Sequence, residues 1–523
     1  MLFSLFDSQS DLPEPLHFLR RKQLQSAKAK YEPELRRFAL ALYFYSTKAY
    51  SFVRKQFRNL LPHPATIRKW SCNTDCKPGF NKDAFASVEK LGHKLQKRMV
   101  CNLVFDEMNI KHHTTRKHGR RFGYVDLGIN NYLVITGEAE ESLVKAHKAL
   151  VFLLVSLNGR FKVPIAYFMV NAINGQARAN LLKICFHLAQ QYSIDIYSLT
   201  YDGEPSNTTT VKSLGIRLDF GSAYTPPKLH FSNPATNEPV WIIPDPCHML
   251  KNIRNCLGDY GTLVDGEGKL ICWSHIVALH ELQEKEGLTA GTKLTERHIQ
   301  YEESKMNVKI ATQTISRSVA EGLEYAESCK AVLKKDHIND VSGTATYCRY
   351  FNDAFDALNC MFRFNNNELK NPYKLPLEEK TEGYLQNFAL EMIAYIKGLR
   401  KMDGMLLIHS RRKTGFIGFI VCLTNIFEMF EYLKEKCNFE YILTYKLLQD
   451  LLETFFSAVR MKGGYCNNPT AYQFQYAVRQ LLIHQQIMHS YNDPNCELDD
   501  IPILYESSTG IKEVSKDEMY PDE

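Results

Sequence analysis

Long hydrophobic runs are missing from this chain. No stretch of about 18 uninterrupted apolar residues occurs, so the sequence predicts no membrane-spanning helix. The start, MLFSLFDSQSDLPEP, carries acids and lacks the basic segment that opens a secretory signal. The 14 cysteines are scattered without a dense framework, which favours reduced thiols over disulfides. We therefore expect an intracellular protein that makes no use of a membrane.

Two common ligand-binding patterns are also missing. No zinc-finger spacing accompanies Cys72, Cys76 and Cys101, and the histidines within residues 112–118 alternate with Lys and Arg, so structural zinc is not favoured. No GxxxxGKS or GxxxxGKT phosphate loop is present, and GLTAGTKL around Lys293 has the wrong spacing. Any bound nucleotide would have to be held in another way.

The composition is that of a globular protein with an uneven charge distribution. With 523 residues, 45% apolar and 23% charged, the chain is long enough for several domains. Residues 1–120 hold 23 Lys/Arg against 10 Asp/Glu, whereas residues 491–523 hold 2 Lys against 10 Asp/Glu. A basic front end suits a polyanion such as DNA, although a solvated basic surface would look the same. The acidic tail is expected to be disordered.

Residues 31–70 predict a small helical unit. Leu35, Phe38 and Leu42 have helical spacing, a second apolar face follows around Phe52 and Phe57, and LPHP at 61–64 breaks the pattern. Thr66 can cap a short helix that carries Arg68 and Lys69. The pattern fits a helix-turn-helix-like DNA-binding region, with a plain helical hairpin as the alternative.

The middle of the chain predicts an α/β fold. Strands are expected in CNLVFDEMNI, RRFGYVDLG, HKALVFLLVSLNGRFKVPIAYFMV, IYSLTYDG and PVWIIPDP, with helices in NGQARANLLKICFHLAQQYSI and NTTTVKSLG. Three strands, a helix, a strand, a helix and a strand are the order of a ribonuclease-H-like core. From about 254 to 410 amphipathic helices replace the strands, which indicates an inserted helical domain.

Three acidic residues in separate segments could hold divalent metal. Asp106 and Asp202 end two apolar runs that predict buried strands, and Glu453 lies on a predicted helix near 447–462. Glu107 would point to the opposite face from Asp106 because side chains alternate along a strand. Asp450 and Glu453 share one helix face because they are three residues apart. Taken singly, each acid fits an ordinary turn or polar helix face; together they could bind two Mg²⁺ for attack at phosphorus.

Eight segments in order carry a resemblance to the P element transposases and their relatives with THAP domains. The segments are FDEMNIK, GYVDLG, YDGEPSN, DPCHMLKNIRN, KLTERHIQYEESKMNVKIATQTISRSVA, FDALN, RRKTGFIGF and QDLLETFFSAVRMKGGYCNNPTAYQF. The resemblance covers roughly residues 30–490. It implies a cut-and-paste DNA transposase of the DDE type, with a ribonuclease-H-like core interrupted by a mainly α-helical GTP-binding insertion.

The resemblance also assigns site residues. Asp106, Asp202 and Glu453 match the catalytic acids that bind two Mg²⁺ ions. Residues matching nucleotide-binding positions are Lys251, Lys269, Phe355, Asp356, Asn359 and Asp450, with the placement of Lys269 the least certain. In this assignment Lys251 supplies charge at phosphate and Asp356 accepts from guanine. GTP in such proteins serves DNA positioning and assembly.

One feature departs from the family pattern. Members usually begin with a zinc-binding THAP domain and a coiled coil, whereas this sequence opens almost directly at the helix-turn-helix region. Site-specific binding to element ends and dimerisation through that coil are therefore open. The chain could be a truncated copy, a shortened gene model or a domesticated derivative. The alternatives to a transposase are a non-catalytic DNA- and GTP-binding protein and a ribonuclease-H-like nuclease of another kind.

The expected organisation follows from these segments. It comprises a flexible lead (1–15), a helix-turn-helix-like region (16–98), the first part of the core (99–253), the helical GTP-binding insertion (254–412), the last part of the core (413–490) and an acidic tail (491–523). Expected partners are DNA ends and target DNA, GTP and a possible second copy of the chain. The expected location is the nucleus.

Overall fold

The computed structural model describes residues 22–23, 30–71, 76–117, 119–128, 144–220, 226–287, 292–329, 340–363, 371–462, 466–488 and 503–504. The flexible lead, most of the acidic tail, Cys72 and His118 lie outside these residues. The 12 described cysteines are all free thiols, in agreement with the expectation from their spacing.

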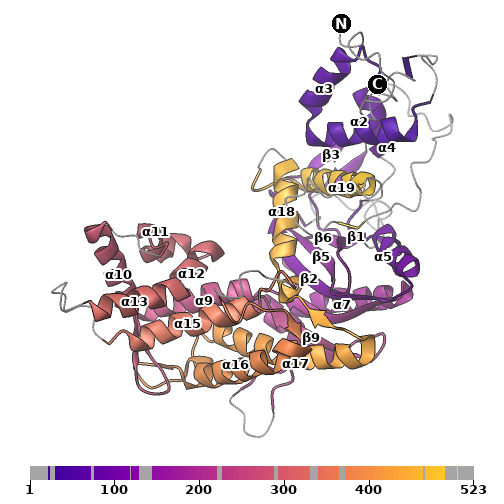
Figure 1. Cartoon of the computed structure of the whole chain (residues 1–523). Coiled ribbons are helices and arrows are strands. Elements are labelled where there is room, and N and C mark those ends of the chain that lie inside the picture. The colour runs from indigo at the N-terminus through magenta and orange to yellow at the C-terminus, as the bar shows by residue number, and fades with distance from the viewer. Residues whose placement is uncertain are drawn as a thin grey trace.

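A mixed sheet forms the centre of the molecule (Figure 1). Its strands are β1 (Gly79–Phe80), β2 (Met99–Asn109), β5 (Lys148–Ser156), β6 (Lys162–Val170), β7 (Ile194–Tyr201), β8 (His230–Ser232) and β9 (Pro239–Pro244), in the order β1-β6-β5-β2-β7-β9-β8. β2, β5 and β6 pair antiparallel, whereas β2, β7 and β9 run parallel. The expected ribonuclease-H-like core is confirmed.

One predicted strand is not part of this sheet. Residues 148–170 form both β5 and β6, with the turn at Asn158–Gly159, while RRFGYVDLG contributes only β4 (Arg120–Phe122) to a separate hairpin with β3 (Thr115–Lys117). Tyr124 and Asp126 make isolated bridges. The chain turns at Gly123, which has a φ of 97° and lies so close to the His113 carbonyl that a Cβ would be 2.2 Å from its oxygen.

Helices cover the sheet and lead to the insertion. α5 (Lys82–Leu95) and α7 (Gly175–Gln191) pack on the core strands, α8 (Pro205–Ser213) packs on α7, and α9 (Pro246–Tyr260) follows β9. The insertion consists of α10 (Trp273–Glu286), α11 (Glu296–Ile299), η3 (Tyr301–Ser304), α12 (Val308–Thr314), α13 (Arg317–Ser328), α15 (Ser342–Ala357) and α16 (Glu379–Gly398). A small sheet of β10 (Thr262–Val264), β11 (Leu270–Cys272) and β13 (Arg400–Lys401) joins it.

The long apolar helix α17 (Thr414–Cys437) returns the chain from the insertion to the core. Among the described residues it is the one helix long and apolar enough to cross a membrane, but 78% of its most apolar window is buried inside the protein. It packs on β9, α9 and α16. The short helix η4 (Leu407–His409) precedes α17. After α17 comes β14 (Tyr441–Ile442), which pairs with β12 (Leu377–Glu378). The chain then enters η5 (Thr444–Leu447). α18 (Asp450–Lys462) and α19 (Ala471–Met488) complete the core.

The N-terminal module contains α2 (Pro33–Tyr45), α3 (Thr47–Gln56) and α4 (Pro64–Ser71). Ser46 caps α3 by accepting from the Ala49 amide, at 3.1 Å. α4 begins at Pro64, so Thr66 is inside the helix and the predicted cap there is wrong; proline is favourable in a first helical turn because its missing N–H is not needed. Leu35, Tyr50 and Ile67 share a small core with Ile483 of α19, which attaches the module to the last helix (Figure 1).

Candidate active site

Two of the predicted acids lie level on neighbouring strands. β2 and β7 run parallel with Val104 opposite Thr200, and this register places Asp106 and Asp202 side by side. Asp202 directly follows β7, as expected. Asp106 does not end its strand but lies inside β2, three residues before its last residue, Asn109. The strand continues because residues 107–109 still pair with β5.

Asp202 is held in a fixed orientation by the start of α8. Its carboxylate accepts from the Glu204 amide at 3.0 Å and from the Asn207 side-chain amide. Gly203 allows the close approach of the next layer, because a Cβ there would lie 2.7 Å from the Met249 methyl and 2.9 Å from the Thr414 methyl. The β7–α8 junction is therefore wedged against α9 and α17.

Glu107 is used differently from its neighbour. Its carboxylate pairs with Lys148, at 2.8 Å, and with the buried Arg178. Arg178 also donates to Asn207, the residue that holds Asp202. The prediction that Glu107 faces away from Asp106 agrees with these contacts, and Arg178 and Asn207 are supporting residues that the sequence reasoning missed.

The surroundings of Asp106 disfavour its charged form. Burial and the charge of Asp202 raise the pKa of Asp106 to about 7, although the Glu107 amide, His248 and Gln449 act in the opposite direction. Two carboxylates that share a partly desolvated site gain from a nearby cation. This pair is therefore a suitable place for a metal ion, since hard divalent cations prefer carboxylate oxygens.

Two buried polar residues pin the segment before α18 onto both strands. Asn102 of β2 donates to the Lys446 carbonyl at 3.0 Å, and Thr200 of β7 donates to the Leu447 carbonyl at 2.8 Å. The following turn continues into α18, where Asp450 and Glu453 occupy the first turn. The strands that carry Asp106 and Asp202 thus also set where the helix with Glu453 begins.

A histidine from α9 stands next to Glu453. Asp245, fully buried, contacts His248 Nδ1 at 2.7 Å, and the other ring nitrogen lies 3.9 Å from the Glu453 carboxylate. Burial lowers the pKa of His248, but the hydrogen bond and charge of Asp245 outweigh it, so that the pKa lies above its usual value. Neither Asp245 nor His248 was singled out from the sequence, although DPCH immediately follows a buried strand.

Glu453 lies beside His248. Among the described residues, no three His, Cys, Asp or Glu side chains are close enough together to hold a metal ion. The structure therefore groups Asp106 with Asp202, and places Glu453 against His248, whose charge also acts on Asp106. The carboxylate donors suit Mg²⁺, and the joint binding of metal by Asp106, Asp202 and Glu453 stays a prediction.

Asp450 lies at the rim of the same region. Its carboxylate accepts from the Cys247 thiol at 3.4 Å. Desolvation, then the charges of Asp245 and Glu453, raise the pKa of Asp450 to about 6.

Two of the predicted nucleotide-binding residues, Lys251 and Asp356, lie on different helices, α9 and α15. Lys251 is buried on α9, close enough to His248 to oppose its protonation, and has no ion pair among the described residues. Asp356, near the end of α15, accepts from the side-chain amides of Asn352, at 3.2 Å, and Asn371. Burial raises the pKa of Asp356, and Lys374, 3.7 Å away, opposes this.

The end of α15 lies beside the segment that leads to α18. Thr444 of η5 donates to the Ala357 carbonyl at 2.8 Å and accepts from the Cys360 amide at 2.9 Å. Phe355 and Asn359 belong to this end, and Asn359 directly precedes Cys360. The FDALN segment is thus connected to the α18 side of the core.

Lys269 lies elsewhere. A Cβ on Gly343, in the first turn of α15, would be 3.1 Å from that of Lys269. Asp356 follows Gly343 by 13 residues, about 20 Å along a helix. Lys269 pairs instead with Glu267, at 2.8 Å. The structure therefore does not bring Lys269 together with Asp356 and Asn359.

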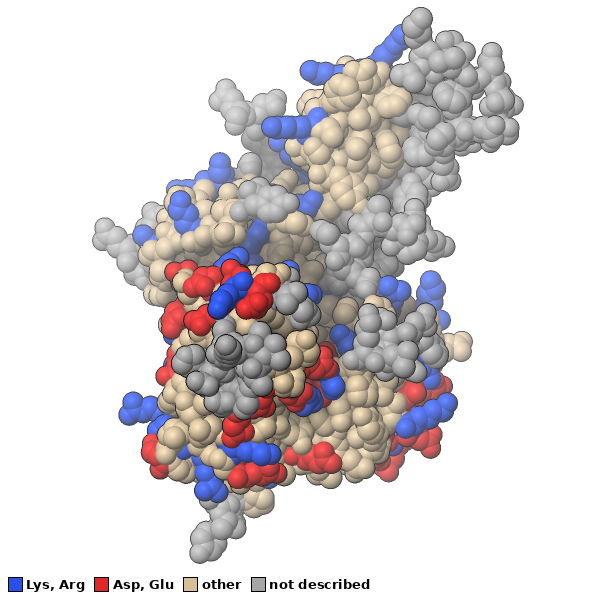
Figure 2. All heavy atoms as spheres, turned by 60° about the vertical axis from the view of Figure 1, so that its left-hand side comes forward, with Lys and Arg blue, Asp and Glu red and all other residues tan. Residues whose placement is uncertain are grey.

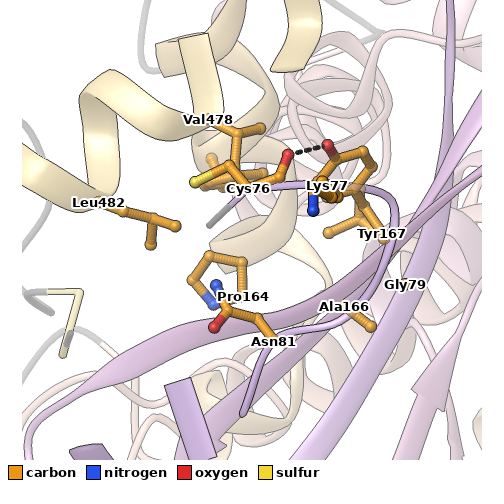
Figure 3. Close-up of a pocket in the computed structure, with 11 residues that line it drawn as sticks. Cys76, Lys77, Gly79, Asn81, Pro164, Ala166, Tyr167, Val478 and Leu482 are labelled. Atoms are coloured by element: carbon orange, nitrogen blue, oxygen red, sulfur yellow. Dashed lines mark hydrogen bonds between the residues drawn. The ribbon is translucent and has the colours of Figure 1, made fainter. Parts of the chain in front are cut away.

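A small cavity elsewhere in the core has no part in this site. It measures about 20 Å³ and lies between β6, Cys76–Asn81 and α19 (Figure 3). Tyr167 closes one side by donating to the Cys76 carbonyl (Figure 3). This volume accommodates about one water molecule, so the cavity is too small for a nucleotide.

Models of four protein-family domains match the chain in sequence order. They are "Transposable element P transposase-like, HTH domain" over residues 3–70, "TNP-like, RNase H N-terminal domain" over 76–215, "TNP-like, GTP-binding insertion domain" over 247–372 and "TNP-like, RNase H C-terminal domain" over 445–478. The chain belongs to the P element transposase family. The carboxylate site lies where this family's two RNase H segments meet, and the FDALN segment lies in the GTP-binding insertion.

Two curated proteins are similar over most of this P element transposase relative. "DNA transposase THAP9" of Homo sapiens is 27% identical over 459 residues, which are 86% of this chain and 48% of that protein. "Transposable element P transposase" of Drosophila melanogaster is 26% identical over 458 residues, which are 85% of this chain and 53% of that protein. The chain thus spans about half the length of the curated relatives it matches.

A solved structure shares the fold. The "Drosophila P element transposase strand transfer complex" superposes with a TM-score of 0.70 and 22% identity, covering 92% of this chain and 97% of that chain. At this identity the likeness shows the fold alone. It agrees with the ribonuclease-H-like core, the insertion and the helix-turn-helix region described above.

Proposed function

We propose that this protein cuts and joins DNA by metal-dependent phosphoryl transfer in the nucleus, acting on DNA ends and target DNA. The observation that carries the proposal is the pairing of Asp106 with Asp202 on adjacent strands, where burial, and then the charge of Asp202, raise the pKa of Asp106 to about 7. Two buried carboxylates of this kind are suited to divalent cations and are not needed for stability.

The roles of the side chains follow from their contacts. Asp106, Asp202 and Glu453 would hold two Mg²⁺, which when bound supply charge at the attacking and leaving oxygens. Asn207 and the Glu204 amide keep the Asp202 carboxylate oriented before any metal is present. Asn102 and Thr200 fix the start of α18, so Glu453 approaches the pair as part of a positioned helix.

GTP binding is proposed at the core side of the insertion. Lys251 offers a buried charge without an ion pair, suited to phosphate, and Asp356 already accepts two amide N–H groups, the kind of donor that guanine offers. Phe355 and Asn359 belong to the end of α15 that contacts η5. Asp450 lies in the first turn of α18, which follows η5 along the chain. Lys269 is left out of this proposal because it lies at the opposite end of α15.

The test is a strand-transfer assay with pre-cleaved DNA ends, Mg²⁺ and GTP. Asp202→Ala and Glu453→Ala should each abolish joining while leaving DNA binding intact. Glu204→Gln is the matched control, since this acid is exposed and only its backbone amide contacts Asp202. Absence of joining by the unmodified protein on any DNA substrate would overturn the proposal.

Nucleotide binding is tested separately by direct titration with GTP. Asp356→Ala should lose guanine-nucleotide binding, and Lys251→Met should weaken binding of the triphosphate. Asp340→Asn, at an exposed acid preceding α15, is the control that should bind normally. Unchanged affinity in Asp356→Ala would refute the assignment of the base-reading residue.

A non-catalytic DNA- and GTP-binding role is the second candidate. In that case GTP and DNA would bind while joining stays absent in the presence of Mg²⁺. We also propose that the chain binds a second copy of itself, whether it joins DNA or only binds DNA and GTP.

A further inference from the structure

A basic hairpin follows the end of β2, the strand that carries Asp106. β2 runs on past Asp106 into the segment 110–114, and β3 and β4 follow. Between Glu107 and Asp126 the sequence holds five Lys/Arg, three His and no acid. Neither the catalytic nor the nucleotide assignment uses this acid-free stretch.

The base of this hairpin is fixed to the core. Lys111 donates from its backbone to the Pro469 carbonyl at 2.9 Å, and the Ala146 amide donates to the Gly123 carbonyl at 2.9 Å. Phe122 meets Tyr472 of α19 edge to face, with ring centroids 5.1 Å apart. The hairpin is therefore positioned by two elements of the core and is not a loose surface loop.

Its cations stand directly opposite one another. Arg116 pairs in register with Arg121, and Lys117 with Arg120. All four side chains are exposed, and within the described residues none has an ion pair or a side-chain hydrogen bond. Like charges at directly opposite positions destabilise a hairpin. The sequence accepts this cost at two consecutive pairs, which indicates that an anionic partner offsets it.

The position of the hairpin identifies the anion. Thr115, the first residue of β3, follows Asp106 by nine residues, so even a fully extended chain would place the start of the hairpin at most about 30 Å from the carboxylate pair. One turn of duplex DNA spans about 34 Å. A duplex with one phosphate at Asp106 can therefore reach the hairpin within a single turn. In the view of Figure 2, the described charged side chains on the upper part of the molecule are Lys and Arg.

We propose that the β3–β4 hairpin binds the sugar–phosphate backbone of duplex DNA within one helical turn of the carboxylate site. Arg116, Lys117, Arg120 and Arg121 contact phosphates and carry no base specificity. This assignment rests on the proposed function for the choice of DNA as partner. It adds a contact surface on the core itself, distinct from the N-terminal helical module.

The test compares two variants of the full chain with equal charge change. One carries Arg116→Gln, Lys117→Gln, Arg120→Gln and Arg121→Gln; the control carries Lys285→Gln, Lys293→Gln, Lys380→Gln and Lys397→Gln, four exposed lysines of the insertion. Binding to a duplex of arbitrary sequence, about four helical turns long, is measured by fluorescence anisotropy in EDTA over a salt series.

The hairpin variant should bind at least tenfold more weakly than the control at about 0.1 M salt. Its slope of log K against log salt should be smaller in magnitude by about 2–4, since each phosphate contact contributes about 0.9. Its unfolding temperature should equal or exceed that of the unmodified protein, because repulsion within the hairpin is removed. A loss of binding through misfolding would lower that temperature instead.

Affinity and slope equal to those of the control would overturn the proposal. An increase in affinity would also overturn it, and would indicate that the hairpin binds the chain's own acidic segments. Because the assay excludes metal, it does not depend on catalysis. If the unmodified protein does not join DNA but the hairpin variant binds DNA more weakly than the control, only the proposed function is refuted. If joining occurs but the hairpin variant binds DNA as the control does, only the DNA-binding role of the hairpin is refuted.

Discussion

Asp106 and Gln449 show how single side chains in this site are left in unfavourable states. The Asp106 carboxylate is desolvated beside Asp202, which raises its pKa to about 7. Gln449 is fully buried near Asp106 and influences its pKa, yet neither polar atom of its side chain makes a hydrogen bond of normal geometry. Such groups cost stability, and a cost retained at a site is consistent with a functional use.

The raised pKa of Asp106 predicts a pH-dependent stability. Between about pH 4 and pH 7 the folded protein holds the Asp106 proton more tightly than the unfolded chain, so this residue lowers stability as the pH rises through that window. Asp106→Asn should therefore become more stable than the unmodified protein, by up to a few kcal/mol, as the pH approaches about 8. Urea unfolding in EDTA measures this; Mg²⁺ should restore the unmodified protein only. Parallel pH profiles for the two proteins would contradict the assignment.

Gln449 gives a second prediction at this scale. Gln449→Leu removes, at nearly constant volume, a buried amide whose polar atoms have no partner of normal geometry among the described residues, although the amide lowers the pKa of Asp106. At about pH 5, where Asp106 is protonated, stability without metal should therefore be equal or higher by about 1 kcal/mol. Gln449→Ala, the volume control, should be destabilised by the cavity it leaves. Urea unfolding distinguishes the two. A leucine variant less stable than the alanine variant would show that the amide has a partner after all.

At the scale of elements, the position of α18 depends on two buried hydrogen bonds. Asn102 and Thr200 lie on the two strands that carry the aspartates and hold the carbonyls of Lys446 and Leu447. Lys446 also reaches back with its ammonium to the Gly159 carbonyl, at 2.7 Å, in the β5–β6 turn. The helix with Glu453 is thus registered against β2, β7 and the β5–β6 turn at once.

Asn102→Ala tests this registration. Removing the amide leaves the Lys446 carbonyl without its donor and should cost about 1–3 kcal/mol in unfolding free energy. The rate of DNA joining at saturating DNA should fall while the DNA dissociation constant stays unchanged, because the change affects only the placement of Glu453. Ser198→Ala is the control: Ser198 donates to the Asn102 side chain at 2.9 Å, and among the described residues its hydroxyl makes no hydrogen bond to η5. Equal loss of joining in both variants would argue against a positioning role.

At the scale of the whole molecule, the N-terminal module is attached to the core through α18 and α19. Ile483 enters the module's apolar core, and Lys462, the last residue of α18, donates to the Phe44 carbonyl at 2.8 Å. Its ammonium also lies 3.0 Å from the centroid of the Phe44 ring. The helix that begins at the carboxylate site therefore ends against the DNA-binding module, as Figure 1 shows for α18.

Lys462 predicts how this junction responds to pH. Desolvation lowers its pKa to about 8, so the folded protein binds this proton less tightly than the unfolded chain between about pH 8 and 10.5. Stability should accordingly rise with pH through that window in the unmodified protein, relative to Lys462→Met. Urea unfolding at the two ends of the window measures the difference. Lys69→Met, an exposed lysine of the same module, should show no such trend, and an equal trend in both would refute the assignment.

The periodicity of the sequence determined most of the elements, because buried strands and amphipathic helices follow from local apolar patterns. The strands around Asp106 and Asp202, the helix after residue 449 and the helical insertion were all visible in this way. The error at RRFGYVDLG arose because alternation alone cannot tell a strand of the main sheet from a short hairpin that turns at Gly123. Asp106 and Asp202 could be singled out as a pair only through the resemblance and the strand order.

Tertiary structure decided the rest, because it depends on contacts between residues far apart in the chain. Local patterns do not predict strand register or packing. Three features depend on them: the Asp245–His248 pair, the two hydrogen bonds onto η5 and the opposed cations of the β3–β4 hairpin. The same is true of Glu453 standing against His248 and of Lys269 lying at the far end of α15. The sequence supplied the acids and their order; packing set which of them meet, since a carboxylate's role depends on the charges and donors that the fold places around it.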